Sequence, residues 1–148
     1  MVVNILAMLL AVVAMEGVAW FTHKYIMHGF LWSLHQSHHS ERHGTFELND
    51  AFSIFFSGLA IALIFFGLET GPIILFWLGI GVSIYGAIYF IFHDVIVHRR
   101  VKIKFIAEHP YLKKIIRAHK IHHKHTGKEH GEAFGFIYIA KKYREMSR

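Results

Sequence analysis

Three long apolar stretches constrain this 148-residue chain more than any other feature. Residues 2–21 carry one charge, Glu16, and residues 51–68 and 73–92 carry none. About twenty apolar residues in a helix cross the hydrocarbon core of a bilayer. The chain is also 54% hydrophobic, which is high for a soluble domain of this size. We therefore predict an all-α integral membrane protein with about three transmembrane helices, forming one domain over residues 1–148.

The basic residues predict the orientation of these helices. None of the sixteen Lys and Arg residues precedes Lys24, and none lies between Arg42 and Arg99. With a tight turn at residues 69–72, three spans put all sixteen on one side, which the positive-inside rule makes cytoplasmic. The expected location is the inner (cytoplasmic) membrane of the cell, which the chain crosses several times.

A further helix is predicted to begin at Pro110. At helical spacing, one of its faces carries Leu112, Ile115, Ile116, His119 and His123. Lysines and arginines take most of the remaining positions. We expect this helix to lie on the membrane surface rather than to span it, with its histidines directed at a shared centre.

The histidines repeat in one compound pattern. Each of two copies reads H-x4-H and then H-x2-H-H, and every cluster adjoins an apolar segment on the same predicted side of the membrane. One ion takes at most about six ligands, so ten imidazoles predict two metal ions. The predicted ligands are ten of the fourteen histidines: His23, His28, His35, His38, His39, His93, His98, His119, His122 and His123.

The two parts of the pattern behave differently in a helix. Positions i, i+3 and i+4 lie within about 100° of one another, so each H-x2-H-H triplet can direct several rings to one side. Five residues turn an α-helix by about 140°, so His23 and His28 are not expected to share one straight face. They would flank one centre or bind two different ions, and the same holds for His93 and His98.

Composition narrows the chemistry. The chain has no cysteine, which removes Fe–S clusters, thiolate haem and Cys-based zinc sites. It has no Glu-x-x-His pair, so a carboxylate-bridged di-iron site is not expected. No Gly-rich nucleotide-binding motif is present, and so no cofactor-binding residues are assigned. Imidazole suits Zn, Cu, Fe and Ni, which leaves the metal open.

Several residues beside the clusters have predicted supporting roles. An acid inside a span is a functional candidate, and Glu16 could orient an imidazole, line a substrate channel or make a helix-packing hydrogen bond. Asp94 could accept a hydrogen bond from a ligand N–H or be a solvated acid. Four histidines fall outside the pattern: His43, His109, His125 and His130. We expect them to be surface residues, hydrogen-bonding partners of the ligands or at most supplementary ligands, with His43 and His130 the better candidates.

These motifs resemble the fatty acid hydroxylase and sterol desaturase superfamily, and within it the bacterial carotenoid hydroxylases. The resemblance covers residues 16–138, and its compound motifs are highly specific. The matching segments are His23-Lys-Tyr-Ile-Met-His28-Gly, Leu34-His35-Gln-Ser-His38-His39, Arg42-His43-Gly44-Thr-Phe46-Glu47-Leu48-Asn49-Asp50, Phe92-His93-Asp94-Val-Ile-Val-His98-Arg99-Arg100, Arg117-Ala118-His119-Lys-Ile-His122-His123, Gly127-Lys-Glu129-His130-Gly131 and Phe134-Gly135-Phe136.

The resemblance implies a non-haem di-iron monooxygenase that uses O2. Such enzymes hydroxylate carbons 3 and 3′ of β-ionone rings, converting β-carotene through β-cryptoxanthin to zeaxanthin, and some accept 4-keto rings. It implies two iron ions held by the ten histidines, with no catalytic residue beyond these ligands. Electrons would come from a ferredoxin-type donor and its reductase. We expect the donor to dock on the basic face near Arg99, Arg100, Lys113 and Lys114.

Other functions fit parts of the sequence. The same chemistry could act on another lipid, as in a fatty acyl or sterol hydroxylase or desaturase. A His-rich membrane protein for metal transport or storage would need polar groups inside its spans, and residues 51–68 and 73–92 contain no charge. The net charge of +6 raises the possibility of nucleic acid, but no nucleic-acid-binding motif is present, and the lipid bilayer is the expected partner.

Overall fold

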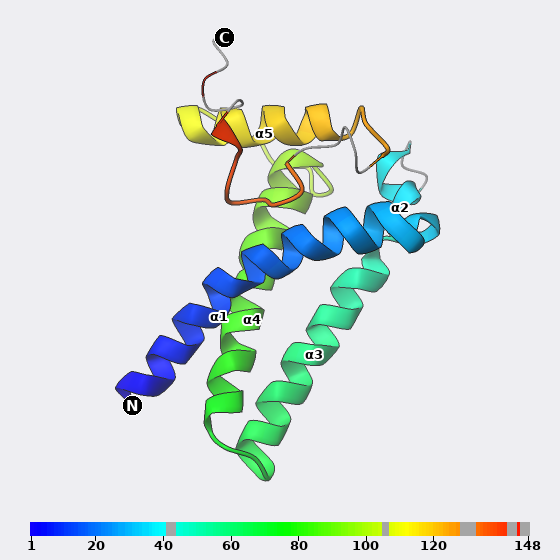
Figure 1. The fold of residues 1–148 in the computed structure, drawn as a ribbon. Coiled ribbons are helices and arrows are strands. Elements are labelled where there is room, and N and C mark those ends of the chain that lie inside the picture. The colour runs from blue at the N-terminus through cyan, green and yellow to red at the C-terminus, as the bar shows by residue number, and fades with distance from the viewer. Residues whose placement is uncertain (41–43, 105–106, 128–132, 142–144, 146–148) are drawn as a thin grey trace.

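Every regular element that the structure describes is helical (Figure 1). The computed structural model describes residues 1–40, 44–104, 107–127, 133–141 and 145. This all-α fold is the predicted one. Its elements are α1 (Val2–Phe21), the π-helical segment η1 (Thr22–Phe30), α2 (Trp32–His39), α3 (Asp50–Glu69), α4 (Ile74–Tyr89), the π-helical segment η2 (Phe90–Val97) and α5 (Pro110–His122).

Three of these helices are long and apolar enough to cross a membrane, which confirms the predicted number of spans. They cover Val2–Phe30, Asp50–Glu69 and Ile74–Val97. In Figure 1 the N-terminus and the α3–α4 turn lie at one end of the bundle, and α2 and α5 lie at the other. The first and third spans exceed the predicted ranges because η1 and η2 continue α1 and α4 without a break.

Helix α4 is the central helix of the bundle and packs against both α1 and α3. Two of its glycines lie at these crossings. A Cβ atom on Gly79 would lie 2.9 Å from the backbone oxygen of Ala60 in α3, and one on Gly81 would lie 2.5 Å from that of Met8 in α1. Lipid tails are as apolar as leucine, so membrane helices associate through close backbone packing at such small residues.

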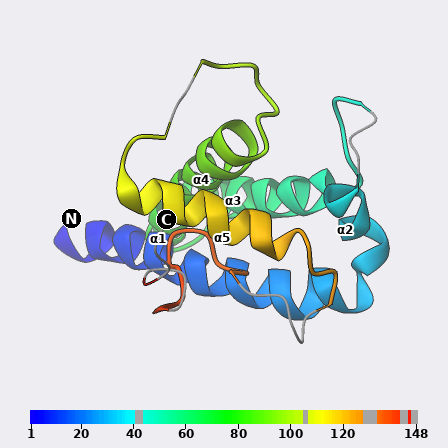
Figure 2. The ribbon, with the colours of Figure 1, turned by 90° about the horizontal axis from the view of Figure 1, so that it is seen from above.

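Helix α5 lies across the end of the bundle (Figures 1 and 2), and it begins at Pro110 as predicted. Its thirteen residues are too few to span a bilayer. Its buried side packs in a small core that also includes η2 and the C-terminal segment 133–140. The fully or nearly buried members of this core are Val97, Ile115, Ala118, Phe136 and Ile139. This packing places α5 directly over the ends of η1 and η2.

Candidate metal centre

All ten predicted ligands come together at the end of the bundle that α2 and α5 cover. Segment η1 supplies two of them and α2 supplies three. Segment η2 and the following His98 supply two, and α5 and the following His123 supply three. Their side chains form two adjoining groups, each built from residues far apart in the sequence.

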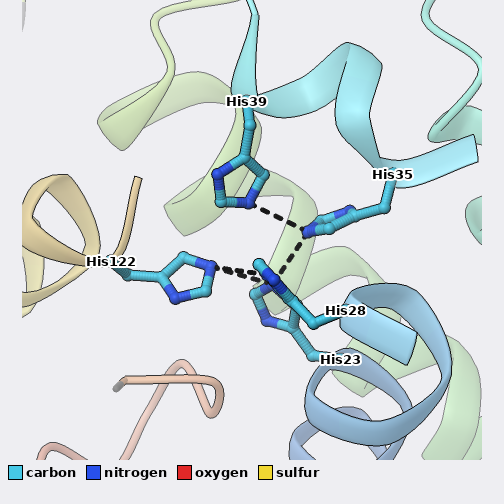
Figure 3. A group of neighbouring side chains, drawn as sticks. All are labelled: His23, His28, His35, His39 and His122. Atoms are coloured by element: carbon cyan, nitrogen blue, oxygen red, sulfur yellow. Dashed lines mark hydrogen bonds between the residues drawn. The ribbon is translucent and has the colours of Figure 1, made fainter. Parts of the chain in front are cut away.

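The first group comprises His23, His28, His35, His39 and His122, whose ligand atoms all lie within 4.8 Å of one another. Figure 3 shows their imidazoles pointing at a common centre from η1, α2 and α5. Measured between Nε2 atoms, His23 lies 3.1 Å from both His35 and His122. The Nε2 atoms of His28 and His122 are 3.2 Å apart, and those of His35 and His39 are 3.1 Å apart.

The second group comprises His38, His93, His98 and His119. The Nε2 atoms of His38 and His93 are 3.1 Å apart, and those of His98 and His119 are 2.8 Å apart. His123 extends this group, because its Nε2 lies 2.9 Å from that of His119. Its ring also stacks on His39 of the first group at a centroid distance of 4.3 Å. The two groups are therefore neighbours.

Neither copy of the sequence motif makes a group by itself. In α2, His35 and His39 join the first group, while His38 between them joins the second. Across the α5 end the division is reversed: His122 joins the first group, and His119 and His123 belong to the second. In each triplet, the first and last histidines are four residues apart and lie on the same face of the helix. The middle histidine is turned by about 100° from the last one around the helix axis. Each triplet thus serves both groups.

Each H-x4-H pair flanks a single group, which is the first of the two expected alternatives. The premise of a straight α-helix is wrong here, because both pairs lie in π-helical turns. A π-turn bonds residue i to residue i+5, which stacks the two members of an H-x4-H pair. The His98 N–H donates to the His93 carbonyl at 2.9 Å, and the two rings lie 4.6 Å apart. The rings of His23 and His28 lie 5.1 Å apart. Each pair therefore belongs to one group.

Hydrogen bonds at Nδ1 set the tautomer of several of these rings. The Nδ1–H groups of His23 and His28 donate to the backbone oxygens of Phe134 and Thr126, each at 2.9 Å. Oxygen accepts from three more Nδ1–H groups: His35 to Asn49 at 2.7 Å, His38 to Glu47 at 3.1 Å and His93 to Asp94 at 3.2 Å. A neutral imidazole that donates from Nδ1 has a bare lone pair at Nε2.

These bare lone pairs show that the site fits a cation. In the pairs His23–His35 and His38–His93, both rings donate from Nδ1, so the 3.1 Å contacts between their Nε2 atoms contain no proton. Two ligands about 2.1 Å from one ion and at a right angle to each other are about 3.0 Å apart, and at a tetrahedral angle about 3.4 Å. The observed distances between Nε2 atoms, 2.8–3.2 Å, match the right-angle arrangement. Five imidazoles also exceed the four ligands of structural zinc.

Burial keeps these imidazoles neutral. Desolvation lowers the pKa of the buried His119. It is also the main cause of the lowered pKa values of the other ligand histidines outside the spans. The pKa values are about 3 for His35, His38, His39 and His123, and about 2 for His98 and His122. The ordinary value is 6.5, so near neutral pH each of these rings offers a lone pair rather than a positive charge.

A buried ion-pair network supports the second group. The Arg100 guanidinium donates to Asp50 at 2.6 and 2.7 Å and to Asp94 at 2.8 Å. The other carboxylate oxygen of Asp94 accepts from His93, as the sequence suggested. Arg100 is 13% exposed, and its pKa is raised by these carboxylates. The Arg100 charge is thus paired inside the fold, and the predicted part of Arg100 in a donor-docking surface stays a prediction.

Glu16, the one charged residue of α1, binds the C-terminal segment. Its Oε1 accepts from three successive backbone N–H groups, those of residues 136–138, at 2.8, 2.8 and 3.0 Å. Its Oε2 accepts from the Tyr85 hydroxyl at 2.8 Å. A Cβ atom at Gly135 would lie 2.8 Å from Oε1, so a larger residue there would have to displace the Glu16 carboxylate. Of the predicted roles for Glu16, the structure shows a packing hydrogen bond rather than a direct contact with an imidazole.

The segment that Glu16 binds covers both histidine groups. The Phe134 ring lies 5.1–5.4 Å from His23, His28 and His122 of the first group. The Phe136 ring lies 5.5 and 5.8 Å from His93 and His119 of the second. One carboxylate in a span thus positions one aromatic cover for each group. The matched Phe-Gly-Phe sequence was the only signal of this role.

A mainly apolar cavity of about 440 Å³ lies between α1, α3 and α4 and reaches His23 of the first group. Its walls within the spans include Met15, Phe52, Phe56, Val82 and Phe90. Its inner end is formed by His23, Asp94, Asn49 and Phe134. The apolar walls of the cavity therefore lead to the first histidine group at His23.

Of the four histidines outside the repeated pattern, the two that the structure describes belong to neither group. His109 and His125 are exposed, and the His109 side chain accepts a hydrogen bond from the Tyr111 N–H at the start of α5. His43 and His130 lie outside the described residues, so their role as supplementary ligands stays a prediction.

Residues 8–140 match the fatty acid hydroxylase family. The β-carotene hydroxylase of Pseudescherichia vulneris is 50% identical over 141 residues, which is 95% of this chain and 80% of that protein. The β-carotene hydroxylase of Pantoea ananas is 44% identical, over 91% of this chain and 77% of its own length. Chloroplastic β-carotene 3-hydroxylase 1 of Arabidopsis thaliana is 40% identical over 92% of this chain, which spans 44% of that protein. No solved structure matches this chain.

The lowered pKa values predict that the metal-free protein loses stability in acid. Between pH 6.5 and about 3 the unfolded chain protonates its histidines, while the folded chain does not. Stability is therefore complete above pH 6.5 and falls as the pH is lowered, by at most about 1.4 kcal/mol per pH unit for each such histidine. Thermal unfolding in detergent with a chelator present, from pH 7.5 to 4, measures this slope. A midpoint that is flat over this range would contradict it.

Replacing Glu16 should loosen the C-terminal segment. Glu16→Met leaves three backbone N–H groups and one hydroxyl without their acceptor, and we expect a loss of roughly 3 kcal/mol in the free energy of unfolding. Tyr85→Phe is the matched control; it removes one of the four hydrogen bonds and should cost about 1 kcal/mol. Chemical denaturation in micelles compares the two variants. Equal stability of Glu16→Met and the unaltered protein would show that the segment is held by other contacts.

Proposed function

This chain belongs to the fatty acid hydroxylase family, and from that premise we propose that it hydroxylates carbons 3 and 3′ of the β-ionone rings of a carotenoid. The names of its relatives, at 38–50% identity over most of the chain, support a hydroxylase enzyme. The observation that carries a hydrophobic substrate is the apolar cavity, which lies between the spans and reaches the histidine centre at His23. The product series would be β-cryptoxanthin and then zeaxanthin, and a 4-keto ring could also enter.

The reaction balances as one ring C–H bond, one O2, two electrons and two protons giving one hydroxyl group and one water. In the proposal, the ten histidines hold a pair of metal ions, five of them in each group. When bound, two irons would supply the redox chemistry that an unactivated C–H bond requires and that redox-inert zinc lacks. No other side chain is assigned a catalytic role.

The outer contacts of the histidines would keep the rings in the ligating orientation. Asn49, Glu47 and Asp94 each accept from one Nδ1–H and so direct the opposite nitrogen at the centre. Partners of this kind fix the tautomer and the orientation of a ligating imidazole. Because Arg100 joins Asp50 to Asp94, it would act as a positioning residue for this shell rather than as a ligand.

The cavity would admit one ring of the substrate with part of its polyene. Its lining follows α3 from Asn49 to Ile61, and twelve residues of helix rise about 18 Å. An elongated hydrocarbon lying along the spans would therefore bring its ring to the histidine end first. Aromatic walls from Phe52, Phe56 and Phe90 suit a conjugated chain.

We further propose that the histidine centre lies on the cytoplasmic side of the inner membrane. The sixteen basic residues support this orientation through the positive-inside rule. A ferredoxin-type donor and its reductase would then supply the electrons from the cytoplasm. A fatty acyl or sterol substrate remains the alternative within the same family, and the relatives named as β-carotene hydroxylases favour the carotenoid.

Carotenoid analysis of a β-carotene-producing host tests the proposal. Cells that express this chain should form zeaxanthin, and the membrane protein purified from them should contain about two irons per chain. His122→Ala removes a fully buried member of the first group and should abolish the product. His125→Ala, an exposed neighbour outside both groups, is the control and should keep full activity. Unchanged β-carotene in cells with the unaltered protein would reject the carotenoid substrate.

A second test narrows the cavity without disturbing the histidines. Gly86 lines the cavity, and a Cβ atom there would meet nothing within 4 Å. Gly86→Leu should therefore fill part of the cavity without disturbing the packing between helices. We expect at least about a tenfold fall in zeaxanthin with unchanged metal content. Gly58→Leu, on the exposed side of α3 and outside the cavity lining, is the matched control. Equal product from both variants would show that the substrate reaches the centre by another path.

A further inference from the structure

The side of α5 that faces away from the bundle is strongly basic. Lys113, Lys120 and Lys124 are exposed there, and Arg117 lies between them on the same face. Residues 109–127 contain five Lys and Arg residues and no acid. A concentration of one charge in so short a stretch raises the local concentration of oppositely charged partners.

This basic face lies roughly opposite the buried histidines of the same helix. At 100° per residue, Lys113, Arg117, Lys120 and Lys124 fall about 100–160° from His119 around the α5 axis. His119 and His122 are 3% and 0% exposed. In Figure 1, α5 lies at the end of the bundle farthest from the α3–α4 turn, so its outer side looks away from the spans.

A shallow groove runs along this face. Its apolar members are Ala107, Ile116 and Ile121, and its cationic members are Lys113, Arg117, Lys120 and Lys124. A docked protein would bury these apolar side chains, while the exposed cations would guide the encounter. The groove is therefore suited to a protein with an acidic surface.

We infer that the basic face of α5 is the docking site of a small acidic electron-transfer protein of the Fe–S type. The inference rests on the proposed function, because each hydroxylation consumes two electrons and the sequence has no motif for a redox cofactor that could supply them. A one-electron donor would dock twice for each hydroxyl formed and be oxidised once at each docking. Docked there, its redox group would be separated from the histidines by about the diameter of one helix, about 10 Å.

The bilayer is a poorer partner for this face. The three spans extend from the histidine centre in the direction away from α5. A membrane that they cross therefore lies on one side of the centre, and the groove lies on the other. Lysines that bind the membrane surface would have to lie on the side of α5 that faces the spans. The inferred surface also excludes Arg100, whose guanidinium is bound by Asp50 and Asp94.

Charge reversal on this face, in the full chain reconstituted in nanodiscs, tests the inference. The test variant is Lys120→Glu with Lys124→Glu, and the donor is a plant-type [2Fe–2S] ferredoxin with its reductase. We expect the KM for ferredoxin to rise about tenfold at low salt, kcat at saturating ferredoxin to stay unchanged, and the difference to shrink at about 0.5 M salt. Binding of oxidised ferredoxin, measured without turnover, should weaken in parallel.

The matched control is Lys102→Glu with Lys104→Glu, which makes the same change of net charge on exposed lysines outside the groove. It should leave the KM for ferredoxin within about twofold of the unaltered protein. Equal effects of the two double variants, or no effect of the test variant, would overturn the inference. So would a test variant that loses binding to phosphatidylglycerol vesicles while its ferredoxin binding is unchanged.

Failure of the proposed function gives a different result. If the unaltered protein forms no hydroxylated carotenoid with ferredoxin or with dithionite and methyl viologen, the reaction is wrong, whatever the binding measurement shows. If the small reductant supports equal turnover in all variants and only the ferredoxin kinetics respond to Lys120 and Lys124, both the function and the docking surface stand.

Discussion

The structure depends on imidazole nitrogens that face one another without protons between them. Oxygen acceptors hold the Nδ1–H groups of His23, His35, His38 and His93, so their Nε2 lone pairs converge at about 3.1 Å. Lone pairs at that distance repel, and burial excludes the water that would separate them. A metal cation between the lone pairs would stabilise the arrangement without shifting the rings. The surrounding fold therefore has to hold the ligands in place, which explains why so many polar contacts surround the centre.

Two π-helical segments let membrane-spanning helices deliver paired ligands. In an α-helix the second histidine of H-x4-H would point about 140° away from the first. In η2 the bond from His98 to the carbonyl of His93 stacks the two rings over one group. π-turns are rare and frequently occur at functional sites. Here α5 and the C-terminal segment pack on η2 through a small apolar core, and they contact η1 through His122 and Phe134.

The sequence predicts the spans, the surface helix and the set of histidines, because these features depend on local composition and spacing. Apolar length fixed the three spans, and Pro110 with its amphipathic pattern fixed α5. The division of the ten histidines into two groups could not be predicted from the sequence. His38 and His122 each belong to a different group from the other histidines of their triplets, and this depends on how α2 and α5 pack in the tertiary structure. The binding of Glu16 to residues 136–138 joins positions 120 or more apart, and no local pattern encodes it.

The histidine layer has an apolar approach on one side and a basic face on the other. His23 borders the cavity that opens between the spans, whereas Lys120 and Lys124 belong to the outer side of α5, the helix that also supplies His122. A hydrophobic substrate and a soluble protein would then reach the centre from opposite directions and would not compete for access. The same layer also separates their environments, because the Phe134 and Phe136 rings cover both groups. In the proposed function, the ten imidazoles would thus be reached by a lipid-soluble substrate and a soluble donor from opposite sides because α5 lies over the end of the bundle.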